Sequence, residues 1–123
     1  MTDKNRYVDV VAKLTRLTQE KKLKWETRTG HSALAEEYTP FYASYRGRHL
    51  RVAKHKPKTN PFLINTFITT GVEEYVALDL VNERGDLIWT FPNVAGLQDL
   101  YEAVQYQIAG VDTLIQDFLK EDD

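Results

Sequence analysis

The clearest pattern in the chain is an apolar stripe near its C-terminus, with successive spacings of 4, 3, 4, 3, 4 and 3. Its members are Leu97, Tyr101, Val104, Ile108, Val111, Ile115 and Phe118. This spacing places them on one face of an α-helix, so we predict a continuous helix over residues 97–119. Gly110 lies inside that helix and is expected to mark close packing against another backbone, because glycine costs roughly 1 kcal/mol relative to alanine there.

The predicted helix is long for the size of the protein. At 1.5 Å per residue it measures about 34 Å, whereas a chain of 123 residues has a radius of gyration of only about 14 Å. The helix would therefore cross the whole domain. Either the rest of the fold covers the full stripe, or part of the stripe contacts a second chain.

The remaining patterns predict a first helix over residues 4–20, after the N-cap candidate Asp3, followed by antiparallel strands. The strands are expected at residues 23–28, 41–45, 49–55, 74–81 and 87–91, with hairpin turns at 46–48 and 82–85. Residues 56–61 are expected to form a loop, and no pattern assigns residues 29–39 and 62–70. The predicted fold class is α+β: an antiparallel sheet of about four to six strands, flanked by an N-terminal and a long C-terminal helix packed on one face.

Length and composition narrow the class of protein. The length fits one domain, residues 1–123. The chain has no cysteine, which excludes disulfides, thiolate metal sites and thiol nucleophiles. The N-terminal segment lacks an apolar run long enough for a signal peptide or a membrane span. We therefore expect a cytoplasmic protein without a membrane partner.

Charge is distributed unevenly along the chain. Residues 1–58 carry 14 basic and 6 acidic residues, and residues 59–123 carry 2 basic and 12 acidic residues, giving net charges of +8 and −10. Such asymmetry suggests a charged partner or oppositely charged faces. Alternatively, the two halves share one fold and neutralise each other.

Two segments resemble a known kind of protein. The run VAKLTRLTQEKKLKW at 11–25 is similar to the opening of small, uncharacterised bacterial α+β domains, in which a first helix leads into a Trp-bearing strand. The runs LDLVNERGDLIW at 78–89 and GLQDLY at 96–101 are similar to their last hairpin and long closing helix. The resemblance covers about residues 9–28 and 75–119, and it implies a fold and no activity. Residues 29–74 depart from it through longer connections that contain proline, and loops of this kind often carry function.

The second hairpin carries a basic cluster, which we call the basic hairpin. Its candidate binding residues are Tyr42, Tyr45, Arg46, Arg48, Arg51, Lys54, Lys56 and Lys58. Cations beside aromatic rings suit a nucleic-acid backbone and its unstacked bases. An acidic protein is a second possible partner. A third interpretation is structural, because charge on an edge strand prevents sheet-to-sheet aggregation.

Most catalytic and metal sites find no support in the sequence. His49 and His55 are about 20 Å apart on one strand, too far to share an ion, so no metal site is predicted. Ser32 and Ser44 lie outside any nucleophile elbow, and no glycine-rich phosphate loop occurs. Asp79 is expected on the solvent face of its strand, beside Tyr75 and Ala77, in a structural role. Trp25, Trp89 and Phe91 are expected in the core rather than in a ligand pocket.

We therefore predict a non-enzymatic binding or regulatory module without a cofactor, and an enzyme acting on a small molecule is kept as a third hypothesis. The module's partner is expected to be another protein, most simply a second copy of the chain, and the alternative is a nucleic acid bound by the basic hairpin. The candidate interface residues are Phe62, Leu63, Ile64, Val111, Ile115 and Phe118.

Overall fold

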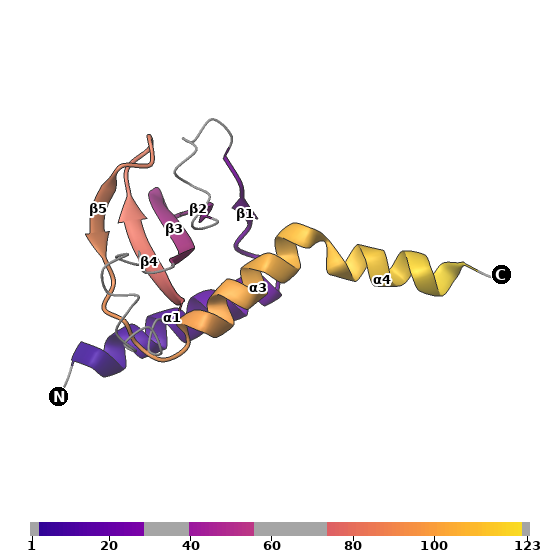
Figure 1. Ribbon diagram of the computed structural model, residues 1–123, viewed down its shortest axis with the longest axis horizontal. Helices are drawn as coiled ribbons and strands as arrows, with labels where there is room; N and C mark the ends of the chain where they lie inside the picture. The colour runs from indigo at the N-terminus through magenta and orange to yellow at the C-terminus, as the bar shows by residue number, and fades with distance from the viewer. Residues whose placement is uncertain (1–2, 29–39, 56–73, 122–123) are drawn as a thin grey trace, which may run out of the picture.

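The computed structural model describes residues 3–28, 40–55 and 74–121 (Figure 1). Within these ranges the chain forms a five-stranded antiparallel sheet and three helices. In chain order the elements are α1 (Asp3–Gln19), β1 (Trp25–Glu26), β2 (Pro40–Tyr45), β3 (Arg48–His55), β4 (Tyr75–Val81), β5 (Leu87–Thr90), α3 (Leu97–Ala109) and α4 (Val111–Lys120). The predicted α+β class is confirmed.

The sheet is a meander, because its strands lie side by side in chain order. The turn between β2 and β3 consists of Arg46 and Gly47, both with positive φ, at 52° and 80°. Turns of this kind match the right-handed twist of the flanking strands. In the turn between β4 and β5, the Asn82 side-chain oxygen accepts hydrogen bonds from the backbone N–H groups of Arg84 and Asp86. Both hairpins lie where the sequence predicts them, and β1 is shorter than expected.

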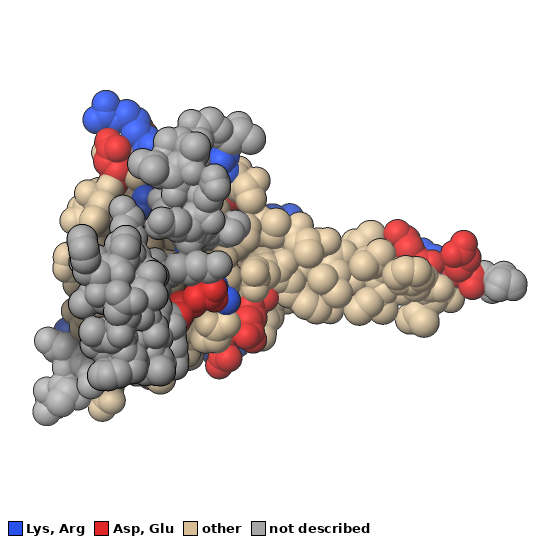
Figure 2. Space-filling view, in the orientation of Figure 1, with Lys and Arg blue, Asp and Glu red and all other residues tan. Residues whose placement is uncertain are grey.

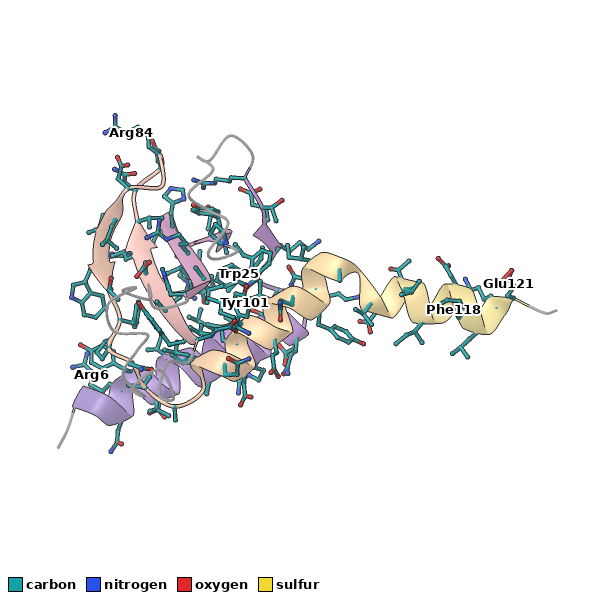
Figure 3. All side chains as sticks on the ribbon, viewed as in Figure 1. Arg6, Trp25, Arg84, Tyr101, Phe118 and Glu121 are labelled. Carbon is teal, nitrogen blue, oxygen red and sulfur yellow. The ribbon has the colours of Figure 1, made fainter. Side chains whose placement is uncertain are left out.

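The hydrophobic core lies between one face of the sheet and the helices α1 and α3, which run side by side beneath it (Figure 1). Figure 3 shows Trp25 and Tyr101 in this layer, between the sheet and the two helices. The fully enclosed core residues include Val11, Val52, Leu78, Leu100 and Val104. Each such side chain contributes about 1.5–3 kcal/mol through burial, so the two helices are firmly attached to the sheet.

Gln107 of α3 ties three parts of the fold together. Its side-chain oxygen accepts a hydrogen bond from the Trp25 backbone N–H at 2.7 Å. Its side-chain nitrogen donates to the backbone oxygens of Thr18 and Leu23, at 3.1 and 2.9 Å. The Trp25 indole N–H in turn donates to the buried Thr18 hydroxyl at 3.0 Å. The end of α1, the start of β1 and α3 are thus joined by one connected network.

The predicted continuous helix over 97–119 is wrong. Gly110 has the left-handed φ of 66° and is both the C-cap of α3 and the N-cap of α4. A residue in the left-handed conformation ends a helix and changes the direction of the backbone, and glycine adopts this conformation without a steric penalty. Close packing is not the reason for this glycine, because a Cβ at position 110 would meet no atom within 4 Å.

We predict that Gln107→Ala lowers the free energy of unfolding by about 2–3 kcal/mol. The substitution leaves backbone groups at the α1–β1 turn without their partner, and each buried unsatisfied group costs roughly 1–3 kcal/mol. Urea unfolding followed by circular dichroism measures the change. Gln105→Ala, at an exposed position on the same helix, is the matched control and should shift stability by less than about 0.5 kcal/mol. Equal effects of the two variants would contradict this role of Gln107.

Candidate functional site

Helix α4 projects from the body of the protein (Figures 1 and 2), and its large apolar side chains are exposed. None of its residues is buried. Phe118 is 68% exposed and Leu119 is 78% exposed, and Leu114 and Ile115 are also exposed. Together with Val111 these four residues occupy positions i, i+3, i+4, i+7 and i+8, which is one helical face. We call them the α4 stripe. Figure 3 shows Phe118 extending from this helix away from the body of the molecule.

Two exposed polar contacts connect α4 to the body across the bend at Gly110. The Tyr106 hydroxyl of α3 donates a hydrogen bond of 2.7 Å to the Asp112 carboxylate of α4. Lys21, which follows α1, pairs with the same carboxylate at 3.5 Å. The hydrogen bond from Tyr106, followed by the charge of Lys21, lowers the pKa of Asp112. The same hydrogen bond raises the pKa of Tyr106.

An apolar groove of about 510 Å³ lies between α1 and the β5 side of the sheet. Its residues are Asp9, Val10, Lys13, Leu14, Leu17, Tyr45, Arg48, Leu50, Leu80, Trp89 and Phe91. Val10 is 41% exposed and Trp89 is 42% exposed. The Trp89 ring contacts Phe91 edge-on, with centroids 4.9 Å apart, and Tyr7 lies 5.9 Å from Trp89. We call this feature the α1–β5 groove.

The outcome for the predicted core aromatics is mixed. Trp25 is buried in the core as expected. Trp89 instead lines the α1–β5 groove, and Phe91 is only partly buried. Alternation along β5 correctly places Trp89 and Phe91 on the face that bears the helices, but neither α1 nor α3 covers Trp89 fully. The sequence carries no signal for the exposure of Trp89, because that exposure depends on where α1 crosses the sheet.

A second cleft, of about 730 Å³, lies at the bend between α3 and α4. It is bordered by the end of α1 and the start of β1, and its charged residues are Lys21, Lys24, Asp99, Glu102 and Asp112. Asp112 is already paired with Lys21 across the cleft. Among the described residues, no three His, Asp or Glu side chains come together as a metal site would need.

The structure divides the basic hairpin into two groups. Tyr42 is buried, so it cannot stack on a ligand, and Arg28 lies over its ring at 4.2 Å. Arg51 is ion-paired with Asp79, and Lys54 pairs with Glu74 at 3.5 Å. These three residues do not form the predicted surface.

The other group lies at the hairpin tip. Tyr45 and Arg48 line the α1–β5 groove, and the exposed Arg46 stacks on the Tyr45 ring at 5.4 Å. Of the remaining predicted site residues, Lys56, Lys58, Phe62, Leu63 and Ile64 lie outside the described residues.

Asp79 is not on a solvent-exposed surface, which corrects the expectation from alternation. It shares a face with Tyr75 and Ala77 as predicted, but its side chain is buried. Its Oδ2 accepts hydrogen bonds from Arg51 Nη2 and Nε at 2.8 and 3.1 Å. Burial opposes the charge of Arg51, but the hydrogen bond and the negative charge of Asp79 outweigh it and raise the pKa of Arg51. The pair is structural, in keeping with the role predicted for Asp79.

In the described part of the chain, no helix combines the length and the apolar character needed to cross a membrane. The three interface candidates in the C-terminal segment are all on one face of α4, where Ile115 and Phe118 are exposed and Val111 is half-buried. Among the described residues, the α4 stripe and the α1–β5 groove are two exposed apolar surfaces that could contact a partner.

We predict that Asp79→Ala destabilises the protein by about 1–3 kcal/mol, because the partly buried Arg51 guanidinium loses its carboxylate partner but keeps its hydrogen bond to the Gly85 backbone oxygen. The double variant Arg51→Met/Asp79→Leu removes both charges and should recover most of that loss. Chemical denaturation of the three proteins measures this. If the double variant were as unstable as the single one, the ion pair would not be the cause.

We also predict a loss of stability when the pH falls below about 6.5, the ordinary pKa of histidine. Burial, followed by the charge of Arg51, lowers the pKa of His55 in the folded protein. The unfolded chain then binds a proton more readily than the folded one, so acid favours unfolding. Denaturation midpoints at pH 7.5 and 5.5 should differ less in His55→Gln than in the original protein. His49→Gln is the control and should keep the full difference.

Comparison with known proteins identifies no relative. No protein-family model matches the chain, and neither a curated protein nor a solved structure matches it. The resemblance to small bacterial α+β domains therefore stays a prediction. Any functional interpretation depends on the residues of this chain and on their arrangement in the fold.

Proposed function

We propose that this protein is a non-enzymatic binding module that self-associates through helix α4. The observation that carries the proposal is the α4 stripe, a continuous apolar helix face that the rest of the described chain leaves exposed. Exposed apolar patches on soluble proteins commonly mark interaction sites. The alternation of apolar and polar residues along α4 is that of a helix with one packed side.

The energetics of α4 support the same proposal. Isolated helices shorter than about 12–15 residues are marginal in water, and most helices depend on packing for their stability. Helix α4 has ten residues and buries none of them. Covering Phe118 alone would contribute about 1.5–3 kcal/mol. Contact with a second protein surface therefore stabilises both the complex and the helix itself.

The nucleic-acid alternative stays a prediction. Arg46 and Arg48 at the hairpin tip are exposed, but Arg51 and Lys54 are engaged with acidic residues of the same sheet. Nucleic-acid binding would weaken steeply with salt, by a log–log slope of about −0.9 for each duplex phosphate contacted. Measuring the mass with and without short nucleic acids, at low and high salt, tests this alternative directly.

We predict that light scattering gives a mass above the 14.3 kDa of one chain and that Phe118→Asp reduces it to that of a monomer. Burying an unpaired charge in an apolar contact is costly. Because Phe118 is exposed, the variant should remain folded, with an unchanged denaturation midpoint for the body of the protein.

Thr113→Asp is the matched control. It adds the same charge to an exposed position of the same helix, and no residue of the α4 stripe lies three or four positions from 113, so this side chain faces away from the stripe. Its mass should equal that of the original protein. A monomeric original protein at all concentrations would refute self-association, and a mass gained only with nucleic acid would favour the alternative.

A further inference from the structure

We propose that the α4 stripe of one copy docks in the α1–β5 groove of a second copy. The inference rests on the proposed function and adds to it the surface that receives α4. An amphipathic helix that lays its apolar side in an apolar groove is a common mode of recognition. This chain carries both parts, and in its described residues neither part is covered by the other.

The two surfaces match in length and in chemistry. On the α1 side, the groove is lined from Asp9 to Leu17, nine residues whose ends lie about 12 Å apart along the helix. The α4 stripe from Val111 to Leu119 also covers nine residues and therefore has the same length. Trp89 and Leu80 lie across the groove from α1 and offer apolar surface to Phe118 and its neighbours.

The charges are complementary as well. Residues 116–123 carry four acidic residues and one lysine, and Figure 2 shows acidic side chains at the tip of the α4 arm. The groove is bordered by Lys13 and Arg48, with Asp9 as its one acidic lining residue, and Arg46 is stacked on Tyr45 beside it. Carboxylates at the C-terminal end of a helix oppose its dipole. The cations at the groove would offset this unfavourable interaction between the carboxylates and the helix dipole. The carboxylates of a second α4 would instead add further negative charge.

This docking defines a head-to-tail assembly. In Figure 1, α4 leaves the body at the end opposite β5, so the two surfaces lie on opposite sides of one molecule. A contact between two different surfaces is heterologous and generates rings or chains. Pairing of α4 with another α4 would be symmetric and would stop at two copies. The mass of the original protein should therefore rise beyond two chains with concentration.

The first experiment places a negative charge in the groove. Val10→Glu alters an exposed residue that lines it, and we expect the variant to be monomeric. Ala12→Glu adds the same charge to an exposed position of α1 that is not among the groove residues, and it should assemble like the original protein. Circular dichroism and denaturation midpoints establish that both variants are folded.

The decisive experiment mixes two defective variants. Val10→Glu retains an intact α4, and Phe118→Asp retains an intact groove. Each alone should be monomeric, and an equimolar mixture should form a complex of two chains and no more, because only one working contact remains. Reversal of the groove charges, Lys13→Glu/Arg48→Glu, should weaken assembly by about tenfold or more, corresponding to about 1.4 kcal/mol.

The outcomes separate this inference from the proposed function. If Val10→Glu assembles like the original protein while Phe118→Asp is monomeric, α4 mediates self-association but docks elsewhere, and the groove is overturned as its partner. A mixture that stays monomeric also overturns the inference. If the original protein is itself monomeric at every concentration, both the proposed self-association and the docking of α4 in the groove are refuted.

Discussion

The hydrogen bonds of the Gln107 side chain connect the two packed helices to the first strand of the sheet. They join the last turn of α1 and the start of β1 to α3, at the point where the core ends. Three residues later, Gly110 ends the helix. Because Gln107 holds the end of α3 against the body, the left-handed glycine directs α4 outward from a fixed point, and the contacts of Asp112 with Tyr106 and Lys21 set its direction.

Helix α1 has two roles that follow from its sequence. Val11 and Leu14 are buried in the core, while Val10 and Lys13 line a groove that the sheet and α1 form together.

The opposite charges of the two chain halves are partly neutralised inside the fold, as the pair of Arg51 with Asp79 shows. In the described part of the chain, the cations at the hairpin tip and the carboxylates of Asp117 and Glu121 form no such ion pair. Some of the opposite charges therefore stabilise the fold as ion pairs, and others are available for contact with a partner.

The fold could be predicted from the sequence wherever local signals agreed with packing. Both hairpins have turn residues that specify them, Arg46-Gly47 and Asn82, and period-two alternation assigned the strands between them. The helix break at Gly110 could not be predicted in the same way. The apolar spacing continues through the glycine unchanged, and a spacing pattern does not report a positive φ. Likewise, the burial of Asp79 depends on Arg51, its neighbour on the adjacent strand. The alternation of residues along one strand gives no information about the side chains of the next strand.

The same break decides whether the second half of the stripe is core or interface. In a straight helix, Phe118 would continue the line of Leu97 and Val104, which are buried against α1 and the sheet. The bend separates the two halves and leaves the second without a surface of its own. An alanine at position 110 would have room for its Cβ but would resist the left-handed φ by about 1–2 kcal/mol. This substitution would therefore destabilise the bend between α3 and α4, and with it the direction in which α4 leaves the body.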